Sequence, residues 1–253
     1  MAVLVTEAIV LHAFDYLETS RIIRMITRDA GVQSVIARGA KSSRKRFGSS
    51  LDLFAQGTAE INIRPNHELQ SLSSFDIGRA RAQYALDVGR FTAGSMIAEL
   101  ALRSSSDESA SGLFDAVEYA LDTVAQSEPS RTVEAGLSGA WFIVATLGFA
   151  PAIDLCANCH ADLDPSQSAA FSHSAGGALC RACGMLAPSS RTIPSGARDA
   201  LRAWTSGASA PPMSNAEMRA HQRLLREFFQ EHVTGDRELR AYQVWERGEW
   251  NAA

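Results

Sequence analysis

Several residue types and patterns are scarce in this sequence, and each scarcity excludes a class of protein. Only four of the 253 residues are cysteines, and only eight are prolines. No run reaches the roughly eighteen uncharged apolar residues that a membrane span needs. The apolar start, Met1–Leu11, has neither a basic flank nor a small-residue cleavage site, so we expect a strand rather than a signal peptide. These features predict a cytoplasmic protein with no membrane partner.

Groups of residues typical of enzymes are missing as well. The six histidines are scattered, and no glycine motif of the kind that cradles phosphates is present. No nucleophile stands with a base, and the carboxylates Asp107 and Glu108 are typical of a solvated helix end. We therefore expect no enzymatic activity. The alternative is a zinc-dependent nucleic-acid-processing enzyme.

Positive charge is concentrated at the front of the chain, although the net charge is -4. Up to Arg90 there are twelve Lys and Arg against nine Asp and Glu, whereas the rest has twelve against nineteen. The only two lysines lie in the segment 41–46. The acidic remainder does not prevent a polyanion from binding at the front.

The first eighty residues are typical of a small β domain. Apolar and polar residues alternate around Ile61 and Ile63, as in a strand with one face in water. Gly31 suits a tight hairpin turn. Five strands in so short a span favour a closed barrel of the OB type. The strands expected are Leu4–His12, Arg21–Thr27, Val32–Arg38, Ala55–Arg64 and Glu68–Phe75.

From Ile77 onward the apolar period becomes helical, and we expect a helical body. Ser214 with Glu217 fits a capping box that begins a helix. The fold class expected is α+β, with an OB-type domain at 1–80, a helical domain at 81–253 and a cysteine-rich insertion at about 153–187. After a first helix from Ile77 to about Ala101, the helices expected span Leu113–Val124, Val133–Leu147 and Ala197–Trp204, with a last one from Ser214 past Phe229.

The four cysteines carry the strongest chemical signal. Cys156 and Cys159 form one pair, Cys180 and Cys183 form another, and twenty residues separate the pairs. This spacing lets two tight turns meet around a tetrahedral ion, and Zn²⁺ suits four thiolates. Four protein ligands leave no open position for catalysis, so the zinc is expected to be structural.

Three other interpretations of these cysteines stay open. Cys156–His160 reads C-x-x-C-H, which also matches haem attachment, but that chemistry ignores the second pair. A dithiol redox pair needs a neighbouring βαβ pattern, and neither pair has one. A degenerate site that no longer binds metal is the third possibility. Zinc content of the purified protein distinguishes them.

The order of several motifs resembles the RecO family of DNA repair proteins. The similar segments cover essentially the whole chain and are weakest after Pro212. One difference is His160, which stands where the family usually has glycine. The motifs that carry the resemblance are Glu7–Leu11, Thr27–Gly31, Val35–Ala40 with the basic segment after it, Leu113–Phe114, Leu147–Pro151 and Gly176–Cys180.

The resemblance implies a recombination mediator. Such a protein binds single- and double-stranded DNA, anneals complementary strands, engages single-strand-binding protein and works with RecR to load RecA. It also implies that the acidic, apolar tail of single-strand-binding protein docks on the helical body. A groove near Arg202, Arg223 or Arg226 is our expectation for that tail. The place expected is the cytoplasm, with the nucleoid.

A strand-binding barrel needs cations to replace phosphate counterions and flat side chains for stacking. We expect the segment 41–46 to contribute most, because Arg21 and Arg24 are an odd number of residues apart and face opposite sides of a strand. An ordinary solvated loop is the alternative, and we assign that role to Arg64, Arg79 and Arg81. The candidate DNA-binding residues are Arg21, Arg24, Arg38, Lys41, Arg44, Lys45 and Arg46, with Phe47 for stacking.

Overall fold

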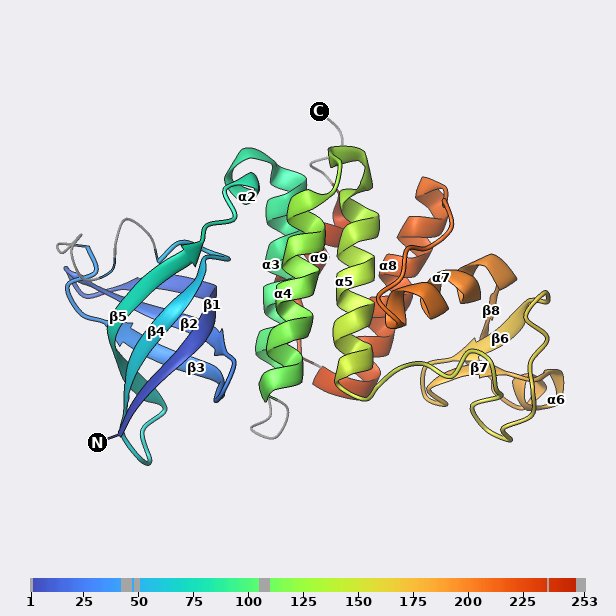
Figure 1. Cartoon of the computed structure of the whole chain (residues 1–253). Coiled ribbons are helices and arrows are strands. Elements are labelled where there is room, and N and C mark those ends of the chain that lie inside the picture. Colours follow the sequence, from blue (N-terminus) through green and yellow to red (C-terminus); the bar gives the residue numbers. More distant parts are fainter. Residues whose placement is uncertain (1, 42–46, 48–50, 105–109, 236, 249–253) are drawn as a thin grey trace.

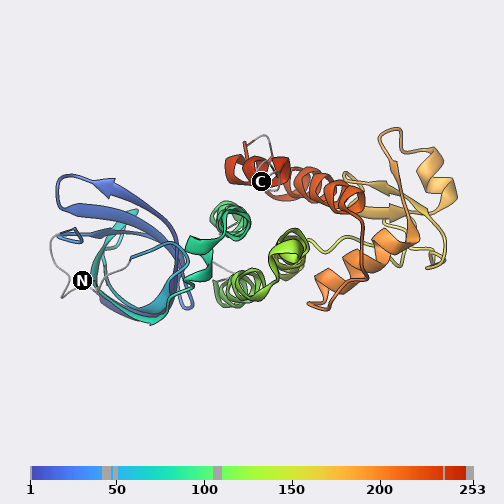
Figure 2. The same cartoon turned by 90° about the horizontal axis from the view of Figure 1, so that it is seen from above.

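A computed structural model gives the arrangement of the chain and describes residues 2–41, 47, 51–104, 110–235 and 237–248. A β-barrel, a helical body and a small cysteine-containing subdomain follow one another in a row (Figure 1). Seen from above, the helices lie between the other two parts (Figure 2). The expected α+β class is confirmed, including the OB-like barrel and the clustering of the four cysteines.

Five strands close the barrel in the order β1-β2-β3-β5-β4. All neighbours are antiparallel except β3 and β5, which are parallel. Gly31 has a φ of 61° at the β2–β3 turn, where a side chain would be strained. The strands are β1 (Ala2–Tyr16), β2 (Ser20–Thr27), β3 (Gly31–Ala37), β4 (Gln56–Ile63) and β5 (Leu69–Arg79).

Two strands are longer than the sequence predicts. β1 runs four residues past His12, to Tyr16, and β5 runs past Phe75 to Arg79, so the helix expected from Ile77 begins later. A β-bulge between Val10 and His12 explains the first difference. It changes which side chains of β1 face outward, so the polar and apolar residues after it no longer follow the alternation before it.

Helices of the body pack around one large apolar core. The capping box at Ser214 and Glu217 is confirmed, and Phe228, Phe229 and Trp204 are buried in this core. A final short helix was not predicted. The helices are α2 (Gln83–Leu86), α3 (Val88–Ser104), α4 (Ala110–Gln126), η2 (Pro129–Arg131), α5 (Thr132–Thr146), α7 (Ser195–Thr205), α8 (Asn215–Phe229), η3 (Gln230–Thr234) and α9 (Arg240–Arg247).

Buried and charged groups fix the barrel to α4. Arg81 is 6% exposed and binds Asp122 at 2.7 Å, so it is a buried structural cation rather than the solvated one expected. Arg79 also pairs with Asp122. Arg28 donates to Asp115 at 2.6 Å, and its pKa is raised by that hydrogen bond. This seam makes the barrel and the helical body one packed unit.

No helix among the described residues is long and apolar enough to cross a membrane. The longest of them, α3 and α4, have 17 residues each.

Candidate metal centre and nucleic-acid interface

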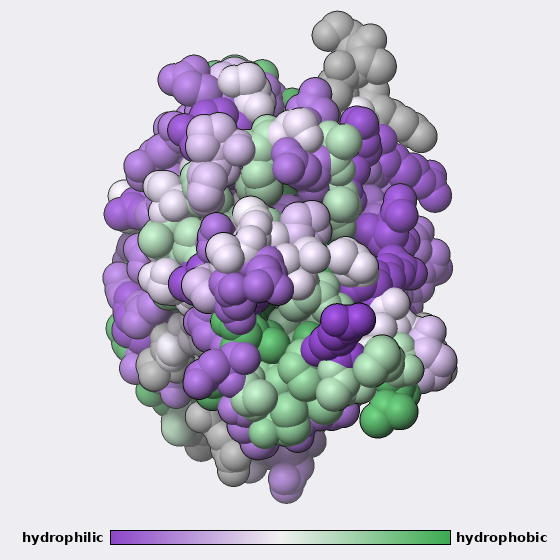
Figure 3. All heavy atoms as spheres, turned by 90° about the vertical axis from the view of Figure 1, so that its right-hand side faces the viewer, coloured by the Kyte–Doolittle hydropathy of each residue, from purple (hydrophilic) through white to green (hydrophobic). Residues whose placement is uncertain are grey.

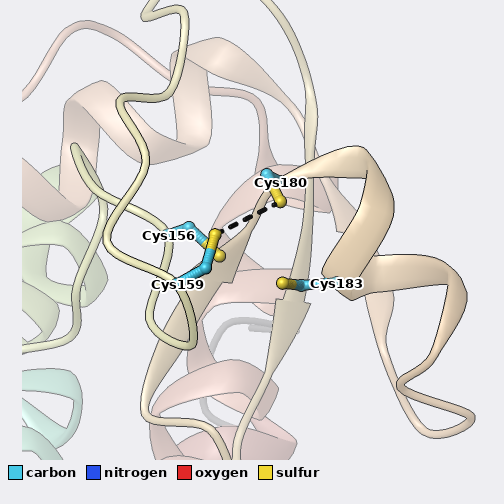
Figure 4. A group of neighbouring side chains, drawn as sticks. All are labelled: Cys156, Cys159, Cys180 and Cys183. Atoms are coloured by element: carbon cyan, nitrogen blue, oxygen red, sulfur yellow. Dashed lines mark hydrogen bonds between the residues drawn. The ribbon is translucent and has the colours of Figure 1, made fainter.

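Short elements bring the two cysteine pairs together. Cys156 and Cys159 lie in a loop, while Cys180 precedes a short helix that contains Cys183. The four side chains converge on one point (Figure 4). The surrounding elements are β6 (Ala169–Ser172), β7 (Gly177–Leu179), α6 (Arg181–Met185) and β8 (Arg191–Ile193), with the three strands in the order β7-β6-β8.

The sulfur positions suit a tetrahedral ion. All four Sγ atoms lie within 4.8 Å of one another, and those of Cys159 and Cys180 are 3.7 Å apart. Four sulfurs at the Zn–S distance of about 2.3 Å form a tetrahedron with edges of about 3.8 Å. The arrangement is therefore compatible with a four-coordinate metal site in which the protein would supply all four ligands.

Close backbone contacts align the two cysteine turns. A Cβ atom on Gly177 would lie 2.2 Å from the carbonyl oxygen of Ala152, so only glycine fits there. The N–H of Ala178 donates to that carbonyl at 2.7 Å, and the N–H of Ala157 donates to the carbonyl of Ala178 at 2.8 Å. Because Ala178 precedes the second pair by two residues and Ala157 lies within the first, this ladder sets the distance between them.

The first turn has an unusual backbone. His160 has a φ of 59°, in the left-handed region, and its N–H donates to the carbonyl of Cys156 at 2.9 Å. A non-glycine residue in this conformation costs about 1–2 kcal/mol. Histidine tolerates this backbone better than most residues, because it is one of those enriched in this region of φ.

The thiols differ in their acidity before any metal binds. Burial raises the pKa of Cys156, but backbone N–H groups of Cys159, Cys180 and Asn158 outweigh it and lower the pKa to about 6. The Cys183 thiol donates hydrogen bonds to the side chains of Cys180 and Cys159, and these bonds raise its pKa to about 12. Four thiolates this close repel one another, and a divalent cation would offset that repulsion.

The outer face of this subdomain is partly apolar. Figure 3 views the molecule from this end and shows apolar residues gathered over its lower half. Met185 and Leu186, just after the second cysteine pair, are 75% and 85% exposed. Cys156 is buried, whereas Cys159 is exposed. The cysteine cluster therefore lies near the surface.

Two of the predicted DNA-binding cations share an acidic partner. Asp15 lies 2.8 Å from Lys41 and 3.5 Å from Arg21, and the hydrogen bond from Lys41 lowers the pKa of Asp15. The carboxylate of Asp15 therefore partly neutralises the charges of Lys41 and Arg21. Three others, Arg44, Lys45 and Arg46, lie outside the described residues.

Two further predicted cations lie on the outer face of the barrel. Arg38 is exposed and donates to Ser71 at 3.4 Å. Arg24 pairs across β1–β2 with His12 and is half-buried. Within the described ranges, neither arginine has a carboxylate in salt-bridge reach. Arg24 lies on β2, and Arg38 lies in the turn that follows β3.

The predicted stacking residue, Phe47, is in the wrong place for that role. It is 2% exposed and belongs to the core inside the barrel, so no base can reach its ring. Phe14 and Tyr16 on β1 are 42% and 41% exposed. Sequence reasoning missed them because it ended the first strand at His12. The alternation of His12, Phe14 and Tyr16 was the signal available.

The three arginines expected to line one groove lie in different environments. Arg202 binds Asp154 and Asp199, and Arg226 binds Glu246 at 3.1 Å. Arg223 instead lines an apolar cavity of about 250 Å³ between β8 and α8. Residues lining this cavity include Phe171, Ile193, Met213, Leu224, Arg191 and His221.

Comparisons with known proteins agree across the chain. A family described as "Recombination protein O N terminal" matches residues 1–81, and "Recombination protein O C terminal" matches residues 85–241. A "DNA repair protein RecO" of Anaeromyxobacter sp. (strain K) is 30% identical over 234 residues, covering 89% of each chain. One of Rubrobacter xylanophilus is also 30% identical over 234 residues and covers 92% of each.

Proposed function

The chain belongs to the RecO family of DNA repair proteins, and from this we propose that it binds single- and double-stranded DNA and anneals complementary strands. It acts by holding strands rather than by cutting them. With RecR it helps to load RecA onto DNA coated with single-strand-binding protein. Its place of work is the cytoplasm, with the nucleoid, because its substrate is the chromosome.

Unpaired positive charge on the barrel carries this proposal. Arg24 and Arg38 lie on the outer face, and the basic segment 41–46 begins three residues after Arg38. Lys and Arg side chains that replace phosphate counterions release them, and this release drives binding to any sequence. The barrel is therefore the primary DNA-binding surface.

Charge reversal tests this assignment. We expect Lys41→Glu/Arg44→Glu/Lys45→Glu to weaken binding to all sequences and to reduce the slope of log affinity against log salt by about 2–3. A matched control reverses three exposed arginines elsewhere, Arg219, Arg237 and Arg247, and should leave the slope unchanged. Equal loss in both variants would mean that net charge alone, rather than the barrel, governs binding.

Annealing of coated strands tests the mediator role itself. Complementary oligonucleotides are saturated with single-strand-binding protein, and duplex formation is followed by fluorescence quenching. The wild-type protein should accelerate annealing, and the triple reversal on the barrel should not. Hydrolysis is measured in the same reactions with and without a chelator. Strand cleavage that the chelator abolishes would instead favour a zinc-dependent enzyme.

We propose that the cavity at Arg223 receives the acidic tail of single-strand-binding protein. Its lining is mostly apolar, and the carboxylate of Glu217 in that lining is held by Ser214. Arg223 has no carboxylate partner in the described part of the chain, and both ring nitrogens of the buried His221 lack a partner there. An anionic, apolar chain end suits such a lining. Arg223→Glu should weaken binding of a labelled tail peptide at least tenfold, whereas Arg202→Glu should not.

The metal that fits the cysteine cluster best is zinc. Four thiolate sulfurs at tetrahedral distances favour a soft, redox-inert ion that binds sulfur. Cys156, Cys159, Cys180 and Cys183 would hold it. Bound there, zinc supplies a structural cross-link, and its role is to fold the segment between Leu155 and Met185.

A further inference from the structure

Exposed rings form a strip along the outer face of β1. His12, Phe14 and Tyr16 alternate on that face, and the rings of His12 and Phe14 are 5.7 Å apart. Alternate residues of a strand are separated by about 6.8 Å. No element of the described structure buries these side chains. The strip offers flat surfaces at regular steps.

The β-bulge creates this strip. Before it, the outward residues Ile9 and Leu11 are buried in the core shared with the helices. After it, the outward positions are His12, Phe14 and Tyr16, which the register pairs with Arg24, Ile22 and Ser20. The strip therefore begins where the seam with the helical body ends.

Cations flank the strip on the same face. Arg24 lies opposite His12 in the β1–β2 register. Arg38 donates a hydrogen bond to Ser71 on β5. Ser71 pairs with Ile36 on β3, and Ile36 pairs with Ile22 on β2. Burial lowers the pKa of Arg24, and so does the positive charge of Arg103, which stands near the end of α3.

Acidic groups leave this face open. Asp15 lies between Phe14 and Tyr16 in β1, so its side chain points to the opposite face of the strand. There it forms ion pairs with Arg21 and Lys41. Neither Arg24 nor Arg103 has a carboxylate within salt-bridge distance in the ranges that the structure describes. The positive charges of these two guanidinium groups repel each other, and a bound phosphate would offset that repulsion.

We propose that this face is a single-strand site, in which unpaired bases stack on Phe14 and Tyr16 while Arg24, Arg38 and Arg103 hold the phosphates. A duplex cannot use the rings, because its bases are already stacked and paired. Base–aromatic stacking tolerates every sequence, since all bases have a flat face. The inference rests on the proposed DNA binding and adds to it a means of preferring single strands.

The test compares three probes on the full-length protein. Anisotropy at fixed salt measures binding of an oligo-dT, of an abasic strand of equal length and of a blunt duplex. Phe14→Ala/Tyr16→Ala should weaken oligo-dT binding at least tenfold and change duplex and abasic binding less than twofold. Val3→Ala/Val5→Ala, which truncates exposed residues at the other end of β1, is the control and should change none of them.

Three further measurements complete the test. Phe14→Leu/Tyr16→Leu keeps apolar bulk without rings and should reproduce the loss, which excludes a folding defect. Arg103→Ala should lower the salt slope for oligo-dT by about 0.7. Photocrosslinking of iododeoxyuridine in a bound strand should map to the peptide containing Phe14.

The outcomes separate the two proposals. Wild-type protein without salt-sensitive DNA binding would overturn the proposed function and this inference together. Wild-type binding that the ring substitutions leave unchanged, or that they weaken equally for duplex and single strands, would overturn the single-strand site alone. A change in oligomeric state without a change in DNA binding would mark the strip as a protein interface and would also overturn it.

Discussion

The barrel and the cysteine subdomain both contain a β-sheet, yet different interactions stabilise the two sheets. The barrel encloses its own core, in which Val10, Ile61 and Phe75 are at most 2% exposed. The apolar residues of the cysteine subdomain, such as Phe171 and Ile193, belong instead to the core of the helical body. A closed barrel is stabilised by its own core, whereas the cysteine subdomain depends on its cross-link and on contacts with the helical body.

Metal removal should give the largest difference between the two regions. We expect Cys156→Ser/Cys180→Ser, or a chelator, to unfold residues 153–187 while the barrel stays folded, because structural zinc supplies about 10–16 kcal/mol in small zinc domains. Hydrogen exchange measured by peptide should show the loss in that segment alone, and zinc content should fall from one per chain. The barrel peptides are the internal control. Well under one zinc per wild-type chain, with free thiols, would reject the site.

The barrel and the cysteine subdomain also differ in how well their strands could be predicted from the sequence. All five strands of the barrel were found to within a few residues, because alternation and turn residues such as Gly31 act locally. The cysteine spacing likewise predicted the cluster. The strands β6, β7 and β8 were not predicted, because strands of three or four residues are too short to show a period.

Placement of single side chains was predicted less well. Phe47 follows a basic run and gives no sign in sequence of entering the barrel, because a chain-distant core decides its burial. Arg81 was expected in solvent, but its partners, the carbonyl of Phe54 and the side chains of Gln56 and Asp122, come from distant segments. Local pattern fixes elements, whereas long-range packing fixes partners.

A buried arginine is the second tie of the cysteine subdomain. Arg198 on α7 is 1% exposed and donates to the carbonyls of Ile153, at 2.6 Å, Asp164, at 2.8 Å, and Gln167, at 3.0 Å. Arg198→Leu should lower the free energy of unfolding by about 3–5 kcal/mol, because those carbonyls lose their donor. Chemical denaturation at saturating zinc measures it.

A neighbouring arginine gives the matched control for that prediction. Arg202 lies one turn further along α7 and forms exposed ion pairs with Asp154 and Asp199. Arg202→Leu should cost about 1 kcal/mol or less, as exposed pairs usually do. If both variants lose the same stability, the carbonyl contacts of Arg198 do not anchor the subdomain.

Truncation inside the barrel tests the other side of the comparison. Ile61 is fully buried, and Ile61→Ala should lower the free energy of unfolding by about 2–4 kcal/mol through lost burial and a cavity. Zinc content should not change. Val5→Ala, 62% exposed on the adjacent β1, is the control and should cost less than about 1 kcal/mol. Loss of zinc from Ile61→Ala would show that the two regions are not independent.

The smallest effect is a pH dependence at the boundary between the cysteine subdomain and the helices. His221 is 3% exposed against Trp204, and burial lowers its pKa to about 4, although the charge of Glu217 raises it slightly. Between pH 6.5 and pH 4 the histidine of the unfolded chain, of pKa about 6.5, is protonated, whereas His221 in the folded protein stays neutral. Stability is therefore complete above pH 6.5 and is lost as the pH falls toward 4, by about 2 kcal/mol at pH 5.

His221→Leu isolates this effect, because leucine has no proton to take up. The difference in unfolding free energy between wild type and variant should move in favour of the variant by about 2 kcal/mol from pH 7.5 to pH 5. Acid loss of metal and protonation of carboxylates occur in both proteins and cancel in the difference. A difference that stays constant over this range would mean that His221 already binds a proton in the folded protein.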